Sequence, residues 1–180
     1  MNRPGKNSEV REARLERLAR RIQELAGKDS ELLRQSREMA AVRRAAALEL
    51  HRTCAGVAAD LNHLLPRDEV MLDPPEFAET AFREDSANLV QINIRGRILQ
   101  ISYTGTGDLV STEDFRIPYS LEGAIRAFNQ ELLEKEVIEE QLLFYTVEKN
   151  RRMWRYFDPR TYRSGPFDRE YLLSLLEQVL

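Results

Sequence analysis

The two histidines of the chain stand near residues that could join them as metal ligands or as a catalytic pair. His51 and Cys54 are three residues apart, and so are Asp60 and His63. On a helix each pair shares a face, where two side chains can bind one metal ion. The two pairs point in different directions, however, and Cys54 also belongs to an apolar row, in which cysteine acts as a small hydrophobic residue. We therefore expect no metal, no cofactor and no catalytic Cys/His pair.

Two further patterns are weaker. The glycine-rich stretch 104–108 follows a predicted strand, but no helix opens directly after it, and phosphate binding by such a loop needs a helix N-terminus. We interpret it as a connecting loop. The acidic neighbours Glu113-Asp114 and Glu139-Glu140 have no predicted burial that would suit them for acid–base work, so we expect them on the solvated surface. With no catalytic constellation in view, the sequence does not predict an enzyme.

The stretch 149–163 is the most unusual. It holds six basic residues and one acid, with aromatic residues interleaved. Three interpretations stay open: arginine and aromatic side chains that stack on single-stranded bases, a protein-binding surface, or a core strand whose arginines protect a sheet edge. We predict a hairpin here that binds a partner. The predicted partner-binding residues are Arg152, Trp154, Arg155, Tyr156 and Tyr162.

Apolar residues recur at heptad spacing in two places before residue 65, which predicts helices that self-associate. The first seam is Leu15, Leu18, Ile22 and Leu25. The second seam is Ala47, Leu50, Cys54, Val57, Leu61 and Leu64. The two seams are out of register, so either one helix carries a four-residue insertion or the chain breaks near Gly27 into a helical hairpin, which we favour slightly. Ser36 and Arg43 are polar residues between the two seams.

The amino-acid composition and the charge limit the class of protein to which this chain can belong. A single cysteine excludes an intrachain disulfide, and with no apolar export signal at the start we expect a cytoplasmic location. No stretch approaches 18 apolar residues, so no membrane partner is expected. Residues 1–65 carry a net charge of +4 and residues 66–180 carry −7. This mild asymmetry favours contact between a basic arm and an acidic surface.

The predicted fold is α+β: a long N-terminal helical arm, as a coiled coil or a helical hairpin, followed by a small, mostly antiparallel sheet packed with two helices. We divide the chain into a disordered segment (1–7), the arm (8–65, capped by Ser8), a linker (66–76) and an α+β domain (77–180). Within that domain we expect short strands at 77–82 and 115–117, hairpins at 89–104 and 142–157, and helices after Ser120 (121–136) and Asp168. The first hairpin should turn at Gly96-Arg97, which places Ile94 opposite Leu99.

From Ala47 onward this order is helix, three strands, helix, two strands, helix. It resembles the order in the small dimeric effector-binding chaperones of type III secretion. The resemblance covers residues 47–180 and implies an acidic cytoplasmic dimer that binds an extended client segment, with no site residue carried over. We expect a non-enzymatic protein-interaction module, a homodimeric adaptor, chaperone or assembly subunit with a protein partner. The alternative is a nucleic-acid-binding protein that uses the Arg-rich arm and the 149–163 hairpin.

Overall fold

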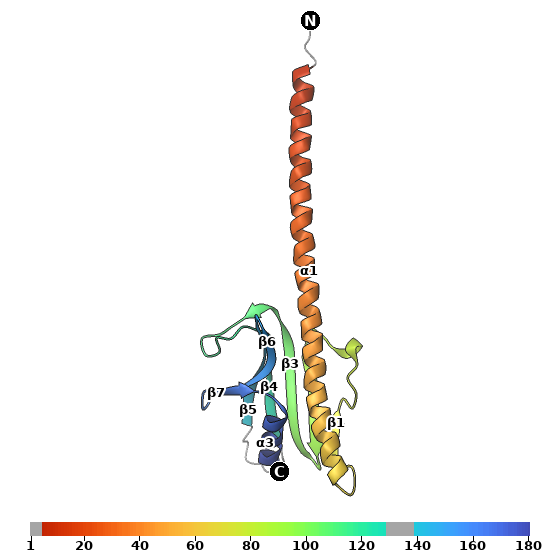
Figure 1. The fold of residues 1–180 in the computed structure, drawn as a ribbon, viewed down its shortest axis with the longest axis vertical. Helices are drawn as coiled ribbons and strands as arrows, with labels where there is room; N and C mark the ends of the chain where they lie inside the picture. The colour runs from red at the N-terminus through yellow and green to blue at the C-terminus, as the bar shows by residue number, and fades with distance from the viewer. Residues whose placement is uncertain (1–4, 129–138) are drawn as a thin grey trace. The chain divides into compact units, whose positions relative to one another are not determined.

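The computed structural model describes residues 5–128 and 139–180 (Figure 1). This part of the chain has a long helix, α1 (Gly5–Leu64), then a seven-stranded sheet and a C-terminal helix, α3 (Arg169–Val179). The fold is therefore α+β, as predicted. The chain divides into two compact units, Met1–Ala40 and Ala41–Leu180. The boundary lies inside α1, so the last part of the helix belongs with the sheet and not with the arm.

Helix α1 is continuous, so the predicted helical hairpin is wrong. It begins at Gly5, within the segment predicted to be disordered and before the predicted cap at Ser8, and it runs through Gly27. Residues 1–4 lie outside the described residues. One glycine inside a helix costs only about 1 kcal/mol relative to alanine. Just beyond it, Arg34 forms ion pairs with Glu31 and Glu38 that favour the helix. The helical preference on both sides of Gly27 outweighs that cost.

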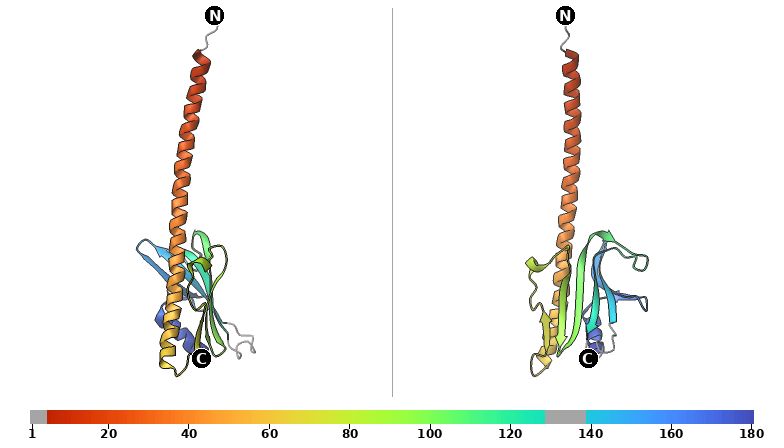
Figure 2. Two further views of the ribbon diagram at one scale, coloured as in Figure 1. Left: turned by 90° about the vertical axis from the view of Figure 1, so that its right-hand side faces the viewer. Right: turned by 180° about the vertical axis from the view of Figure 1, so that it is seen from behind.

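The sheet is antiparallel throughout, and its strands lie side by side in chain order (Figure 2). The strands are β1 (Val70–Asp73), β2 (Asn88–Ile94), β3 (Arg97–Val110), β4 (Tyr119–Phe128), β5 (Glu139–Glu148), β6 (Arg151–Asp158) and β7 (Arg163–Pro166). β1 lies within the segment predicted to be a linker. The strand predicted at 77–82 is instead the 3-10 turn η1 (Glu79–Ala81) with its flanks, and residues 115–117 are a loop.

The largest error concerns residues 121–136, predicted to be a helix capped by Ser120. Residues 119–128 form β4, which pairs with β3 and β5, and residues 129–138 lie outside the described part. Both faces of β4 are covered: Leu121 and Ile125 are buried on one face, and Ala124 is buried on the other. A strand with small and apolar residues on both faces loses its alternation and imitates helical spacing.

This correction also removes the basis of the resemblance to the type III secretion chaperones. That resemblance rested on a helix between the third and fourth strands of the domain. In the described residues the order after α1 is seven strands and one final helix, which is a different order of elements.

The β2–β3 hairpin forms as predicted, but its register is shifted by two residues. The turn is Arg95-Gly96, and both residues have positive φ (53° and 90°), as a type I′ turn requires. Ile94 lies opposite Arg97 and not opposite Leu99 as predicted. Because Arg97 is exposed at the end of the hairpin, its charge stays in water and the pairing costs little.

A shift of two residues leaves every side chain on its predicted face. The prediction that one face of this hairpin is buried is therefore confirmed. The buried residues are Val90, Ile92, Ile94, Leu99, Ile101 and Tyr103. They share one core with Leu172 and Leu176 of α3. Phe128 lies in the segment predicted to be a helix but belongs to β4, and Leu132 of the same segment lies outside the described residues.

The main core lies between this sheet face and the two helices, the last part of α1 and α3. Asp168 caps α3 as predicted, because its carboxylate accepts a hydrogen bond from the backbone N–H of Tyr171 at 2.9 Å. A second, smaller cluster lies on the opposite sheet face, where Phe115, Tyr119, Phe144 and Phe157 pack together. The alternation of Phe144 with Leu143 along β5 places the two clusters on opposite faces.

Arg43 of α1 is a buried cation that ties the helix to the sheet. Its guanidinium donates hydrogen bonds to the carbonyl oxygens of Ser120 (3.1 Å), Gly107 (3.2 Å) and Thr106, and it lies 3.3 Å from the Glu84 carboxylate. The side chain is only 7% exposed. A buried charge is tolerated when it is paired and hydrogen-bonded, and Arg43 meets both conditions.

We predict that Arg43→Met lowers the free energy of unfolding by about 2–4 kcal/mol, because it leaves buried carbonyl groups without a donor. Urea denaturation followed by circular dichroism measures this change. The control is Arg44→Met, which removes the same side chain from the exposed neighbouring position and should change stability by less than about 0.5 kcal/mol. Equal effects of the two substitutions would contradict the role assigned to Arg43.

Candidate functional site

The residues considered for metal binding or catalysis hold the fold together instead. His51 is buried, and its Nε2 donates a hydrogen bond to the carbonyl oxygen of Pro74 at 2.8 Å. Cys54 is fully buried, and burial raises the pKa of its thiol to about 12. Asp60 forms an ion pair with Arg169 at 2.5 Å. Within residues 5–128 and 139–180, no three His, Cys, Asp or Glu side chains gather as a metal site would require.

The glycine-rich stretch 104–108 belongs to β3, so its interpretation as a loop is wrong. The backbone N–H of Gly105 donates a hydrogen bond to the carbonyl oxygen of Glu84 at 3.1 Å. A Cβ atom at residue 105 would lie 2.7 Å from that oxygen, so glycine allows this close approach. Gly105 therefore serves backbone packing beside Arg43, in a strand that no helix N-terminus follows.

Trp154, the central residue of the predicted partner-binding hairpin, lies in the main core. Its side chain is 2% exposed, and its indole N–H donates a hydrogen bond to the carbonyl oxygen of Ala46 at 2.8 Å. The rings of Tyr103 and Tyr145 pack edge-on against it at 5.4 and 5.3 Å. Trp154 thus joins α1 to β6 and is unavailable to a partner at the surface of the folded chain.

The other residues predicted for this hairpin are divided between its two faces. Arg152 and Tyr162 are exposed, while Arg155 and Tyr156 are half-buried. The ring of Tyr156 stacks on Tyr171 of α3, with ring centres 3.7 Å apart and planes 2° apart. Arg152 and Tyr162 therefore remain as surface groups, without the tryptophan that was expected to anchor a partner among them.

The second heptad seam packs mostly inside its own domain. Ala47, Leu50, Cys54 and Val57 are fully buried in the main core. Leu61 is half-buried against the same core, and Leu64 is exposed at the end of α1. The apolar stripe of this part of α1 thus packs against the sheet of the same chain. Only its last residue, Leu64, is left exposed to contact another chain.

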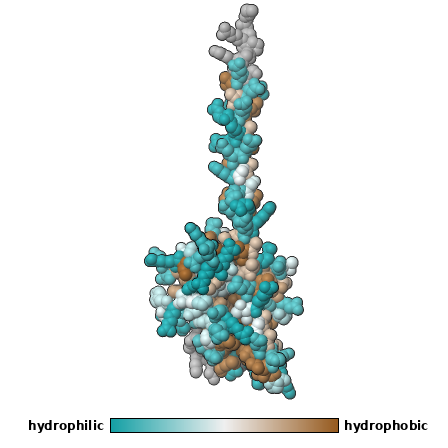
Figure 3. Space-filling model, viewed as in Figure 1, coloured by the Kyte–Doolittle hydropathy of each residue, from teal (hydrophilic) through white to brown (hydrophobic). Residues whose placement is uncertain are grey.

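The first heptad seam, by contrast, is exposed. It lies in the unit Met1–Ala40, where apolar residues recur along an otherwise hydrophilic helix (Figure 3). Leu32 continues the same spacing beyond a polar position at Asp29, which the sequence analysis missed. We call this row the arm stripe. Its members Leu15, Leu18, Ile22, Leu25 and Leu32 are each between 50% and 64% exposed.

The two edges of the arm stripe differ in character. On one side of the stripe, the residue just before each of Leu15, Ile22 and Asp29 is basic, namely Arg14, Arg21 and Lys28. The opposite edge carries small or apolar residues, namely Ala19, Ala26 and Leu33. The stripe is thus bordered by positive charge on one side and widened by apolar side chains on the other.

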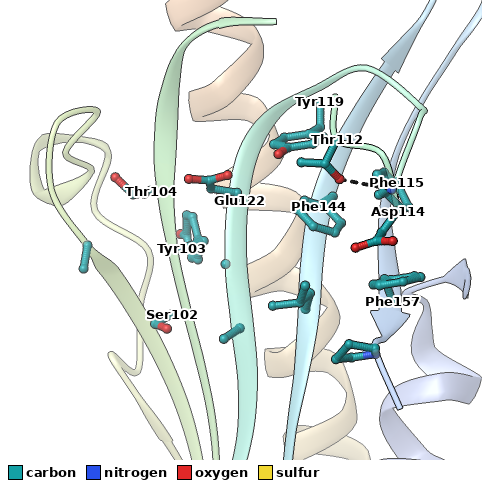
Figure 4. A pocket seen from close by; sticks show the side chains of 15 residues that line it. Ser102, Tyr103, Thr104, Thr112, Asp114, Phe115, Tyr119, Glu122, Phe144 and Phe157 are labelled. Atoms are coloured by element: carbon teal, nitrogen blue, oxygen red, sulfur yellow. Dashed lines mark hydrogen bonds between the residues drawn. The ribbon is translucent and has the colours of Figure 1, made fainter. Parts of the chain in front are cut away.

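A cavity of about 550 Å³ opens on the sheet face opposite α1 and α3 (Figure 4). Its walls come from β3, β4, β5, the end of β6 and the loop between β3 and β4. Phe115 and Phe144 stack there, with ring centres 4.4 Å apart. Thr112 holds the loop in place: its backbone N–H donates to the carbonyl oxygen of Phe115 at 2.8 Å, and its hydroxyl accepts from the N–H of Phe115 at 3.0 Å. The cavity therefore has a fixed aromatic wall.

Two carboxylates, Glu122 of β4 and Asp114 of the loop, also line this cavity. Figure 4 shows them on opposite sides of Phe144. Burial, followed by the negative charge of Glu122 and a hydrogen bond with it, raises the pKa of the Tyr119 hydroxyl. Asp114 is exposed, as predicted, whereas Glu122 was expected on a helix and lies on β4. No local pattern in the sequence predicts that they line one cavity, because that arrangement requires β4 to be a strand.

No protein-family model, curated protein or solved structure matches this chain. Among the described residues, no helix is long and apolar enough to cross a membrane. The functional argument therefore rests on the residues of the arm stripe and of the cavity.

We predict that Trp154→Ala lowers the free energy of unfolding by about 3–5 kcal/mol, the usual cost of removing a buried aromatic side chain. Arg152→Ala, in the same strand but exposed, should cost less than about 0.5 kcal/mol. Thermal melts and urea denaturation of both variants test the assignment. If Trp154→Ala left stability unchanged, Trp154 would be a surface residue and the partner-binding interpretation would return.

Proposed function

We propose that this protein is a non-enzymatic interaction module that associates with a second copy of itself through the arm stripe and acts as an adaptor, chaperone or assembly subunit. The observation that carries the proposal is the exposure of five apolar side chains at heptad spacing, from Leu15 to Leu32. Such a row on a helix is stabilised when a second helix covers it. Each leucine or isoleucine that is fully buried in this way contributes about 1.5–3 kcal/mol.

The charges beside the stripe favour a second copy in parallel orientation. In a parallel pair the basic edge of one helix lies beside the opposite edge of the other, so Arg14, Arg21 and Lys28 face small or apolar residues. Lys28 of one copy also lies beside Asp29 of the other, at the one charged position within the seam. The parallel pair also brings the two Asp29 carboxylates into one layer, where the Lys28 side chains beside them supply the opposite charge.

The antiparallel arrangement is less favourable for the same residues. It sets the basic edges of the two helices against each other, so Arg21 of one copy approaches Lys28 of the other. It also places the Asp29 carboxylate opposite Leu18, an apolar side chain. Like charges held side by side are destabilising, so a parallel pair is the arrangement that we propose.

We predict that the full-length protein is a dimer at micromolar concentration and that Ile22→Glu makes it monomeric, because the change brings two glutamates into one apolar layer. Size-exclusion chromatography with light scattering measures the mass. The matched control is Gln23→Glu, which adds the same charge to the neighbouring position outside the stripe and should leave the dimer intact. A monomeric wild type, or equal behaviour of the two variants, would contradict the proposal.

We predict also that Leu18→Cys forms an intermolecular disulfide under mild oxidation, because the two copies of residue 18 meet in one layer of a parallel pair. In the antiparallel alignment that sets Leu18 opposite Asp29, the two cysteines would lie 11 residues apart, about 16 Å along the helix axis. Gln23→Cys is the control and should not cross-link. The natural Cys54 does not interfere, because it is buried with a thiol pKa of about 12. A non-reducing gel distinguishes the outcomes.

Nucleic-acid binding is the second candidate function, and the basic edge of the arm stripe favours it. Arg14, Arg21 and Lys28 recur every seven residues along one side of the helix, where they could contact phosphate groups. Binding that rests on phosphate contacts weakens steeply as salt is raised. A salt titration against single-stranded RNA and DNA, with a variant that changes all three residues to glutamine, separates this function from self-association.

A further inference from the structure

The cavity on the open sheet face has the size and the walls of a small-molecule site. Its volume of about 550 Å³ falls in the range of 300–1,000 Å³ that is usual for ligand pockets, which are mostly apolar with a few polar groups. Phe115, Phe144 and Phe157 supply aromatic walls, and Gly123 and Ala124 of β4 leave room at the base. A single protruding side chain of a partner protein would not fill a space of this volume.

The charge of the residues that line the cavity determines which charge a ligand should carry. Glu122 and Asp114 are the acidic residues, and no lysine, arginine or histidine lies among the lining residues. Neither carboxylate forms an ion pair within residues 5–128 and 139–180. An anionic ligand would therefore meet only negative charge. A neutral apolar ligand would displace water from the carboxylates without supplying an opposite charge, which costs free energy.

A cation with an apolar body satisfies both features of the cavity. Its charge is attracted to the carboxylates and also to the faces of aromatic rings, which carry negative potential. Its apolar part fills the space between Phe115, Phe144 and the small residues of β4. Figure 4 shows Glu122 and the aromatic side chains in the same cavity, so one ligand can reach both.

We infer that this cavity binds a small organic cation, in which a quaternary or protonated amine is joined to an aromatic or short aliphatic body. Glu122 holds the positive charge, Asp114 adds to the negative potential from the loop side, and the phenylalanine rings contact the apolar body. The hydroxyls of Ser102 and Thr104, on the β3 side of the cavity, are available to polar substituents.

The test is a titration of the full-length chain with three related probes, followed in ¹H–¹⁵N correlation spectra. The probes are benzyltrimethylammonium, benzyl alcohol and benzoate, which share a benzene ring and differ in charge. We expect benzyltrimethylammonium to bind about tenfold more tightly than benzyl alcohol, as a cation–π contact and a carboxylate together would provide. Benzoate should not bind. The shifted resonances should belong to residues of β3, β4, β5 and the loop at 112–115.

Variants separate a specific site from general attraction to an acidic protein. Glu122→Gln should weaken benzyltrimethylammonium binding about five- to tenfold, because it removes one charge without changing the shape of the side chain. Glu148→Gln removes the same charge from an exposed position of β5 outside the cavity and should have no effect. Ala124→Leu should abolish binding by filling the cavity, and a thermal melt verifies that each variant is folded.

Equal affinity for benzyltrimethylammonium and benzyl alcohol, or unchanged affinity in Glu122→Gln, would overturn the inference. Tight binding of benzoate would do the same. This result is independent of the proposed self-association, because every lining residue lies in the unit Ala41–Leu180 and the arm stripe lies in Met1–Ala40. A monomeric protein can still bind the cation, and a dimer can fail to bind it.

Discussion

The buried guanidinium of Arg43 is the interaction on which the architecture of the sheet domain depends. It binds carbonyl groups of Thr106, Gly107 and Ser120. These carbonyls belong to the parts of β3 and β4 where the regular strand pairing is interrupted. Where the pairing is irregular, backbone carbonyl groups lack a partner in the neighbouring strand. The guanidinium of Arg43, which carries five N–H donors, supplies hydrogen bonds to them. The strands can therefore depart from regular pairing there without leaving buried carbonyl groups unpaired. This allows the loop between β3 and β4 to cover the far face of the sheet. The cavity opens on that far face, and its lining includes the loop at 112–115 that follows the irregular part of β3.

The fold was predictable where one face of a helix or strand is buried and the other is exposed to solvent. The alternation in β2 and β3 identified the buried residues correctly, and Asp168 with the leucines after it identified α3. The hairpin register was missed because a type II′ turn at Gly96-Arg97 and apolar cross-strand pairs were preferred, whereas Arg95 adopts the positive φ of a type I′ turn. β4 was missed because both its faces are covered, so its residues show no alternation. Arg43 looked like a defect in a coiled coil, since its acceptors lie more than 60 residues away.

The two candidate sites differ in how far the sequence reveals them. Most of the arm stripe was visible, because heptad spacing is a local pattern and the helix needs no distant residue to form it. The cavity was invisible, because its lining spans residues from 87 to 159 and depends on strand pairing in β4. The 149–163 stretch shows the opposite failure: arginines beside aromatic residues looked like a binding surface. The burial of Trp154 is decided by the carbonyl group of Ala46, 108 residues earlier in the chain, which no local reading of the hairpin can supply.

The chain-order arrangement of the sheet has a consequence for the sequence of events in folding. Each strand pairs with the strand next to it in the chain, so every pairing closes a comparatively short loop and forms rapidly. The bonds that attach α1 to the sheet span 77 and 108 residues and close much longer loops. We expect successive hairpins to assemble first and the helix to dock last. During synthesis the helix emerges from the ribosome before any strand, and its indole partner in β6 emerges near the end. Until then the apolar side of the helix is uncovered, and this interval is when the nascent chain is most open to premature association.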